Sequence, residues 1–137
     1  MEEKLKAVKT IHIALILGLV LAYFFAGNLL NFDFFQIPEI ESSTYPFLLI
    51  PVAAIFLGNF LYKQQLKNAD KRLPLEDKIG VYQTASLIRW AVVEGAAFVI
   101  LFVKPELIVI GLLLIVYLVF LKPSKEGMKR DFDAVIQ

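Results

Sequence analysis

Four long apolar segments limit what this chain can fold into. They cover, approximately, residues 8–30, 46–62, 82–103 and 106–121. About 20 mostly apolar residues, each rising 1.5 Å along a helix, cross the ~30 Å hydrocarbon layer of a membrane. The apolar residues come in runs rather than in the stripes that build a soluble core. The sequence therefore predicts an all-α integral membrane protein with four transmembrane helices, arranged as two helical hairpins.

Composition agrees with a single membrane domain over residues 1–137. Of the residues, 58% are hydrophobic, whereas soluble domains have roughly 45–50%. The second and fourth spans are short, so we expect them to stand upright or to use Tyr45, Tyr62 and Lys122 as interfacial anchors. There is no cysteine, which excludes disulfides, thiolate metal sites and thiol nucleophiles. The first span lacks a small-residue cleavage site and is expected to remain in the mature protein.

The distribution of basic residues predicts the orientation of the spans. Lys and Arg gather before the first span, between the second and third, and after the fourth, while Lys104 alone lies at the opposite side. By the positive-inside rule, both termini and the middle connection face the cytoplasm of a plasma or inner membrane. The loop between the first two spans has no Lys or Arg and is predicted to be extracytoplasmic. It contains Asp33, Glu39 and Glu41, with Phe32, Phe34 and Phe35 expected near the headgroups.

Two cytoplasmic extensions are expected. In the connection at about 63–81, the segment KQQLKNADKR continues the second helix without a breaker, and Pro74 suits the first turn of the next helix. These features predict a short helical hairpin. The tail at 122–137 mixes basic and apolar residues. It is either a short helix at the membrane surface or against a partner, or a solvated and frayed terminus.

Polar side chains within the spans are the candidate functional residues. Arg89 lies about 10 Å into the third span, so its guanidinium can snorkel to the headgroups. His12, near the start of the first span, is expected to form a hydrogen bond at the interface. A metal or haem site would need more ligands than the membrane segments offer, and no cofactor is predicted.

Glu94 lies near the middle of the third span, where an acidic residue costs roughly 3 kcal/mol. Arg89 is separated from Glu94 by about 140° around the helix, so an ion pair within the helix is disfavoured. We expect Glu94 to be uncharged and to face protein or an enclosed polar cavity. Asn59, Tyr117, backbone carbonyls, trapped water or a basic group of another subunit are its candidate partners.

Pairs of small residues predict where helices approach closely. Ala91 and Gly95 flank Glu94 on the third span, and Ala54 and Gly58 lie beside Asn59 on the second. Residues spaced by four share a helix face, and small residues there let two backbones come close. Both pairs are therefore candidate helix-packing sites.

The segment IRWAVVEGAAFVILF resembles the carboxylate helix of rotary ATPase proteolipid subunits. The resemblance implies that Glu94 carries a proton. It covers this helix only, because the neighbouring segments IHIALILGLVLAYFF and PFLLIPVAAIFLGNF have one glycine each where that family has a glycine-rich helix. Family membership is not inferred from it.

These features favour a small integral membrane protein that acts as a helix-packing subunit or accessory factor of a larger membrane complex. The alternative is a proton- or cation-handling component that uses Glu94. No intramembrane Ser/His pair, paired carboxylates or His-rich motif indicates an enzyme. The topology accounts for the basic residues, so nucleic acid is not an expected partner. The expected partners are the lipid bilayer and other membrane subunits or further copies of the chain.

Overall fold

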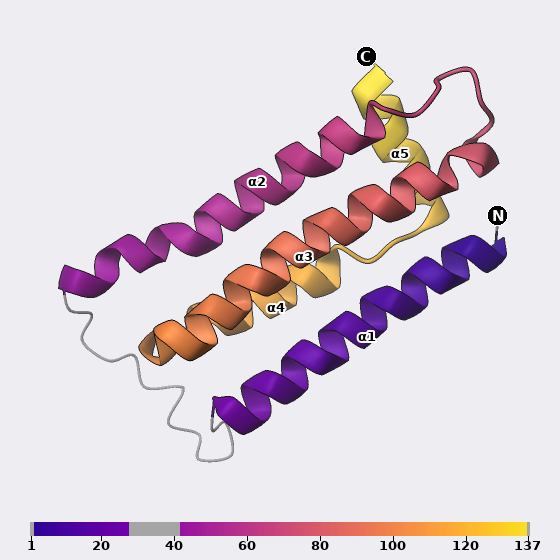
Figure 1. Cartoon of the computed structure of the whole chain (residues 1–137). Coiled ribbons are helices and arrows are strands. Elements are labelled where there is room, and N and C mark those ends of the chain that lie inside the picture. The colour runs from indigo at the N-terminus through magenta and orange to yellow at the C-terminus, as the bar shows by residue number, and fades with distance from the viewer. Residues whose placement is uncertain (1, 28–41, 137) are drawn as a thin grey trace.

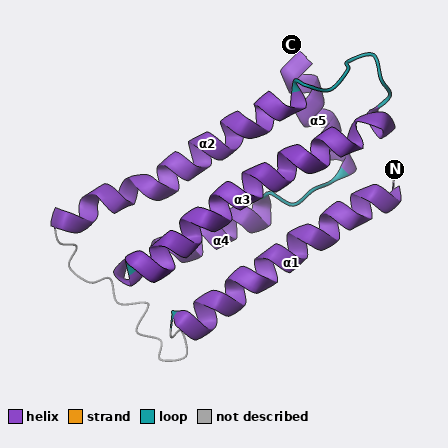
Figure 2. Ribbon diagram, in the orientation of Figure 1, coloured by secondary structure: helices purple, strands orange, loops and turns teal. Residues whose placement is uncertain are grey.

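A computed structural model of the chain describes residues 2–27 and 42–136. Every regular element within these ranges is a helix, which confirms the all-α prediction (Figure 2). In chain order they are α1 (Glu2–Ala26), η3 (Ser42–Leu48), α2 (Leu49–Leu66), η4 (Leu75–Lys78), α3 (Ile79–Val103), η5 (Pro105–Leu107), α4 (Ile108–Phe120) and α5 (Lys125–Ile136).

Three continuous helical stretches are long and apolar enough to cross a membrane: Glu2–Ala26, Ser42–Leu66 and Leu75–Val103. A fourth is counted only if α4 and α5, which are bent by 93° at a short break, are taken together. The 13 residues of α4 extend only about 20 Å. The predicted fourth segment is thus the shortest of the four.

The helix boundaries differ from the predicted ones in two places. α1 begins at Glu2 rather than near residue 8, and the acidic Glu2 and Glu3 in its first turn suit the positive end of the helix dipole. The helical extension expected through KQQLKNADKR is wrong beyond Leu66. There Asp70 accepts a hydrogen bond from the backbone N–H of Arg72, a local turn that competes with the helix. Residues 28–30 and the predicted extracytoplasmic loop through Glu41 lie outside the described residues.

α3 is the central helix of the bundle (Figure 1). α1 and α2 lie on either side of it, and α4 packs alongside it, joined to it through η5. The main contacts of α1 are with α3 and α4 rather than with α2. The first predicted hairpin is therefore not a packed pair, whereas α3 and α4 do pack against each other.

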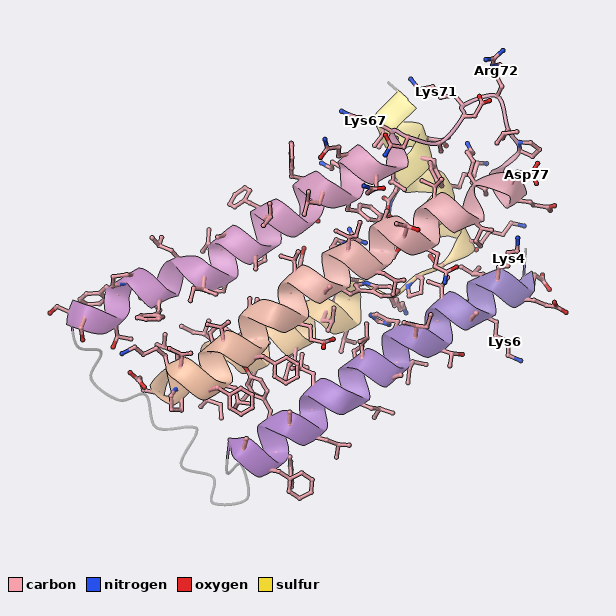
Figure 3. All side chains as sticks on the ribbon, viewed as in Figure 1. Lys4, Lys6, Lys67, Lys71, Arg72 and Asp77 are labelled. Carbon is pink, nitrogen blue, oxygen red and sulfur yellow. The ribbon has the colours of Figure 1, made fainter. Side chains whose placement is uncertain are left out.

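Both termini lie at the same end of the bundle (Figure 1). Figure 3 places Lys4, Lys6, Lys67, Lys71 and Arg72 at that same end. The basic segments that are far apart in the sequence therefore gather at one end of the molecule, here called the basic end.

The buried side chains form two clusters. The larger one fills the space between the four long helices and is centred on Trp90, Val93 and Ala97 of α3. The smaller one lies at the basic end, where Met128 and Phe132 of α5 pack fully buried against α1, α2 and α3. Of the two alternatives for the tail, the structure thus has the helix.

The start of α5 is capped by a side chain. The backbone N–H of Gly127 donates to the hydroxyl oxygen of Ser124, 2.9 Å away, which satisfies a donor that the first turn of a helix leaves free. Pro123 comes immediately before this cap and cannot supply a helical N–H. The two residues explain why α4 stops and α5 begins in a new direction.

One tyrosine joins three helices in the larger cluster. The fully buried Tyr23 of α1 donates its hydroxyl to the carbonyl oxygen of Ala97 on α3. Its ring lies so close to Gly111 of α4 that a Cβ atom there would overlap it. Gly111 is therefore required by this close approach.

We predict that Gly111→Ala lowers the free energy of unfolding in detergent by about 1–3 kcal/mol, because the buried and hydrogen-bonded ring of Tyr23 has no free space to move into. Gly18→Ala is the matched control, since no atom lies within 4 Å of a Cβ there. The control should be neutral, or stabilising by up to ~1 kcal/mol through helix propensity. Equal unfolding midpoints for the two variants, followed by circular dichroism, would contradict the proposed packing.

Candidate functional site

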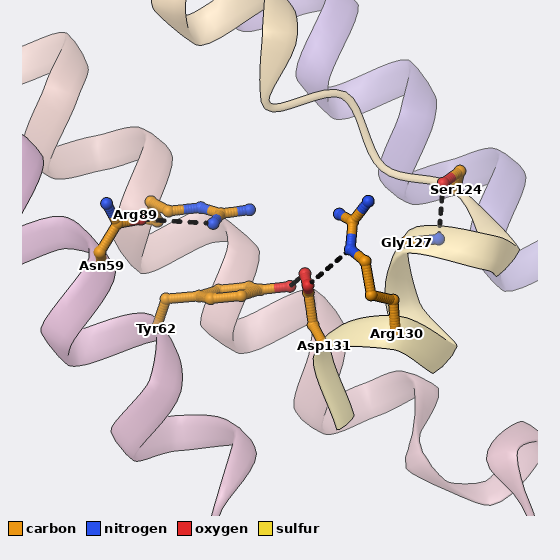
Figure 4. A network of polar contacts seen from close by, with 7 residues as sticks. All are labelled: Asn59, Tyr62, Arg89, Ser124, Gly127, Arg130 and Asp131. Carbon is orange, nitrogen blue, oxygen red and sulfur yellow. Dashed lines mark hydrogen bonds and ion pairs between the residues drawn. The ribbon is translucent and has the colours of Figure 1, made fainter. Parts of the chain in front are cut away.

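A cluster of polar side chains lies between α2 and α3 towards the basic end (Figure 4). Asn59 and Tyr62 are three residues apart on α2 and so share a face. Arg89 of α3 meets both: its Cζ lies 3.6 Å from the centroid of the Tyr62 ring, and its guanidinium donates to Asn59 Oδ1 at 3.5 Å. The cation is thus held over an aromatic face, which attracts it electrostatically.

Small residues let α2 approach α3 at this point. Ala54 and Gly58 are both buried, and a Cβ at Gly58 would lie 3.4 Å from Cγ of Arg89 and 3.5 Å from its carbonyl oxygen. The Ala54–Gly58 pair therefore packs within the chain, against α3. This close approach brings Arg89 within reach of the α2 side chains.

The cluster extends to α4 and α5. Asn59 donates to the hydroxyl of Tyr117 on α4 at 3.3 Å. Tyr62 donates to a carboxylate oxygen of Asp131 on α5 at 2.6 Å, and Asp131 also pairs with Arg130 at 3.3 Å. Side chains of α2, α3, α4 and α5 are thereby linked through hydrogen bonds and one cation–π contact.

The environment of Arg89 differs from simple snorkelling. Its guanidinium lies between helices on Tyr62, and its Nε atom is buried without a hydrogen-bond partner in the described part of the chain. A buried charged group is stabilised only as far as its neighbours replace water. The ring face of Tyr62 and the amide oxygen of Asn59 supply that compensation.

Glu94 is not part of this cluster. Its side chain is half-buried, and its Oε2 atom is covered but has no hydrogen-bond partner among the described residues. Asn59 and Tyr117, named above as candidate partners, bond to each other instead. No ion pair joins Glu94 to Arg89 within residues 2–27 and 42–136.

The second pair of small residues is exposed. Ala91 and Gly95 lie on the surface of α3, and no described atom outside the local helix backbone comes within 4 Å of the Cβ position of Gly95. The two pairs have the same spacing, but only the Ala54–Gly58 pair packs against another helix of this chain.

His12 contributes to a separate polar site at the end of α4. Its Nε2 donates to the carbonyl oxygen of Leu118 at 2.8 Å, and the indole N–H of Trp90 donates to the carbonyl oxygen of Leu121 at 3.3 Å. The two rings are 4.7 Å apart between centroids. Both carbonyls lie at the C-terminal end of α4, where helices leave acceptors with spare hydrogen-bonding capacity. The carbonyl oxygen of Leu118 also accepts from the backbone N–H of Leu121 at 3.1 Å. The hydrogen bond expected for His12 is present.

The sequence analysis missed Asp131 of the polar cluster, Trp90 beside His12, and Tyr23 in the larger hydrophobic cluster. Trp90 and Tyr23 are buried aromatic side chains with a polar atom, and such side chains usually find a hydrogen-bond partner. That rule would have singled them out, although it names no acceptor.

The described side chains indicate little further chemistry. No group of three or more His, Cys, Asp and Glu residues that could hold a metal ion occurs in residues 2–27 and 42–136. No protein-family model, curated protein or solved structure matches this chain.

We predict that Tyr62→Phe loosens α5, because the hydroxyl that bonds to Asp131 is lost while the ring under Arg89 is kept. A hydrogen bond to a charged group contributes about 1.5–3 kcal/mol, so amide hydrogen exchange within α5 should accelerate about tenfold or more. Tyr45→Phe is the control, since Tyr45 is 55% exposed. Unchanged exchange in α5 of the Tyr62 variant would rule out a role for this bond in docking the tail.

Proposed function

We propose that this chain is a small integral membrane protein that acts as a helix-packing subunit or accessory factor of a larger membrane complex, with no catalytic activity of its own. The observation that carries the proposal is the exposed Ala91–Gly95 surface of α3 beside Glu94, whose side chain has no hydrogen-bond partner for its Oε2 atom within residues 2–27 and 42–136. A transmembrane helix of a partner subunit is the occupant that fits this surface.

Two physical arguments support that occupant. Small residues at a four-residue spacing allow a second helix backbone to approach closely, as Gly58 already does within the chain. In lipid, a polar atom without a hydrogen-bond partner costs several kcal/mol. Glu94 is only half-buried and its Oε1 atom is not among the covered atoms, so a donor on a partner helix would bond to Oε1, whereas a lipid acyl chain would not.

The outer surfaces of the helices fit an apolar surrounding. Large apolar side chains are exposed along α1, α2 and α4, and Phe56 and Phe120 are more than 70% exposed. Such a surface is unusual for a monomer in water. The other members of this set are Ile13, Leu17, Val20, Leu21, Phe24, Phe25, Leu49, Val52, Leu57, Phe60, Leu113, Val116 and Val119.

The proposed topology has four transmembrane helices with both termini in the cytoplasm. It is supported by the collection of Lys and Arg residues at one end of the bundle (Figure 3). For this topology, α4 with its 13 residues is shorter than the ~30 Å hydrocarbon layer, so the bilayer should be thinned next to it or the helix should be shielded by protein.

Cysteine labelling tests this orientation, and the native chain has no cysteine to interfere. We predict that Ser43→Cys in intact cells reacts with a membrane-impermeant maleimide. Lys71→Cys, at the basic end, should react only after permeabilisation. Both positions are exposed. The reverse pattern would invert the proposed topology.

Assembly is tested at the exposed small-residue surface. We predict that the native protein migrates above the monomer on native gels of mildly solubilised membranes, and that Gly95→Leu shifts it to the monomer by blocking close approach. Gly18→Leu is the matched control, because it also has free space around it in an apolar helix and should leave assembly unchanged. A native protein that migrates as a free monomer would refute the subunit proposal.

Proton or cation handling by Glu94 is the second candidate function, and its support is the covered, unpartnered Oε2 atom. Glu94→Gln separates the two candidates. The amide keeps the size and hydrogen-bonding capacity of the side chain, so assembly should survive. Proton handling would be lost, because the titratable proton is absent.

A further inference from the structure

A groove opens on the surface between α1 and the end of α4, near the basic end. Its volume is about 460 Å³, and its lining is mostly apolar. Ile13 and Ile16 of α1 and Val119 of α4 contribute apolar walls, and Lys9 and Lys122 contribute the charges. No Asp or Glu lines it.

The groove results from the length of α4. This helix ends at Phe120, and the chain then turns by 93° into α5. α1 runs past this point to Glu2 without an α4 neighbour. The hydrogen bond from His12 to the carbonyl oxygen of Leu118 holds α1 against α4 at the inner side of the groove. No other side chain of the described residues fills the space on the outer side.

The distribution of charge in the groove matches one class of ligand. Lys9 comes before Ile13 and Ile16 in the sequence, and Lys122 comes after Val119. Neither lysine belongs to an ion pair within the described ranges. A soluble anion would make no contact with the apolar walls of the groove. A zwitterionic or neutral lipid would leave the charges of the two ammonium groups uncompensated. An anionic phospholipid satisfies both parts, with its phosphate at the lysines and an acyl chain along the isoleucines.

We propose that this groove binds one anionic phospholipid of the cytoplasmic leaflet. The assignment of the leaflet rests on the topology proposed above, whereas the binding itself rests on the groove. Lys9 of α1 and Lys122 of the link between α4 and α5 recognise the phosphate from two different segments, so a bound lipid also bridges α1 to the α4–α5 junction.

The test is native mass spectrometry of the detergent-solubilised chain titrated with phosphatidylglycerol or with phosphatidylcholine of the same acyl chains. Each lysine near a lipid phosphate contributes about fivefold to affinity, so the Lys9→Gln/Lys122→Gln variant should bind phosphatidylglycerol about 25-fold more weakly. Lys63→Gln/Lys67→Gln removes the same charge from exposed positions at or just after the end of α2 and should bind like the native chain.

Each other outcome overturns the proposal. Equal binding of the two lipids, equal loss in both double variants, or no loss in the groove variant would show general charge attraction or no site. Inorganic phosphate that competes as well as the lipid would make this a free-anion site. The measurement uses single chains in detergent, so it succeeds or fails independently of partner assembly and of orientation.

Discussion

The carbonyl oxygens at the C-terminal end of α4 need hydrogen-bond donors from neighbouring helices, and the packing of α1 and α3 against α4 supplies them. Pro123 has no N–H to donate to the helix, and the last turn of α4 lies among apolar side chains. The backbone N–H of Leu121 donates to the carbonyl oxygen of Leu118, His12 adds a second donor to that oxygen, and Trp90 donates to the carbonyl oxygen of Leu121. These bonds hold α1 and α3 at the point where α4 stops, and they fix the place at which the chain turns into α5.

The polar cluster around Arg89 has a related cause. Close packing of Gly58 on α3 leaves the guanidinium between two helices, and Tyr62 covers its face while bonding to Asp131. The charge is thereby accommodated inside the chain and is not left for a partner to neutralise. Glu94 has no such arrangement, which is why the proposed interface lies on its side of α3 and not at Arg89.

The helical class and the approximate helix positions could be predicted from the sequence, because the length and position of an apolar run are visible along the chain itself. The partners of the polar residues could not. His12 was expected to form a hydrogen bond, but its acceptor is 106 residues away in the chain. Asn59 was one of several candidate partners for Glu94, because the helical period defines the faces of a helix without saying which neighbour meets each face. The C-terminal end of α2 depends on the local turn at Asp70, which apolar periodicity does not register.

The contact between Tyr23 and Gly111 also limits how the helices can move. If α1 slid along α4 by one helical turn, about 5.4 Å, the ring would meet Leu107 or Ile115, both of which are buried and far larger than glycine. Its hydroxyl would leave the carbonyl oxygen of Ala97 at the same time. Piston-like displacement of α1 is therefore blocked at a single position, and this contact couples movements of α1 to those of α3 and α4.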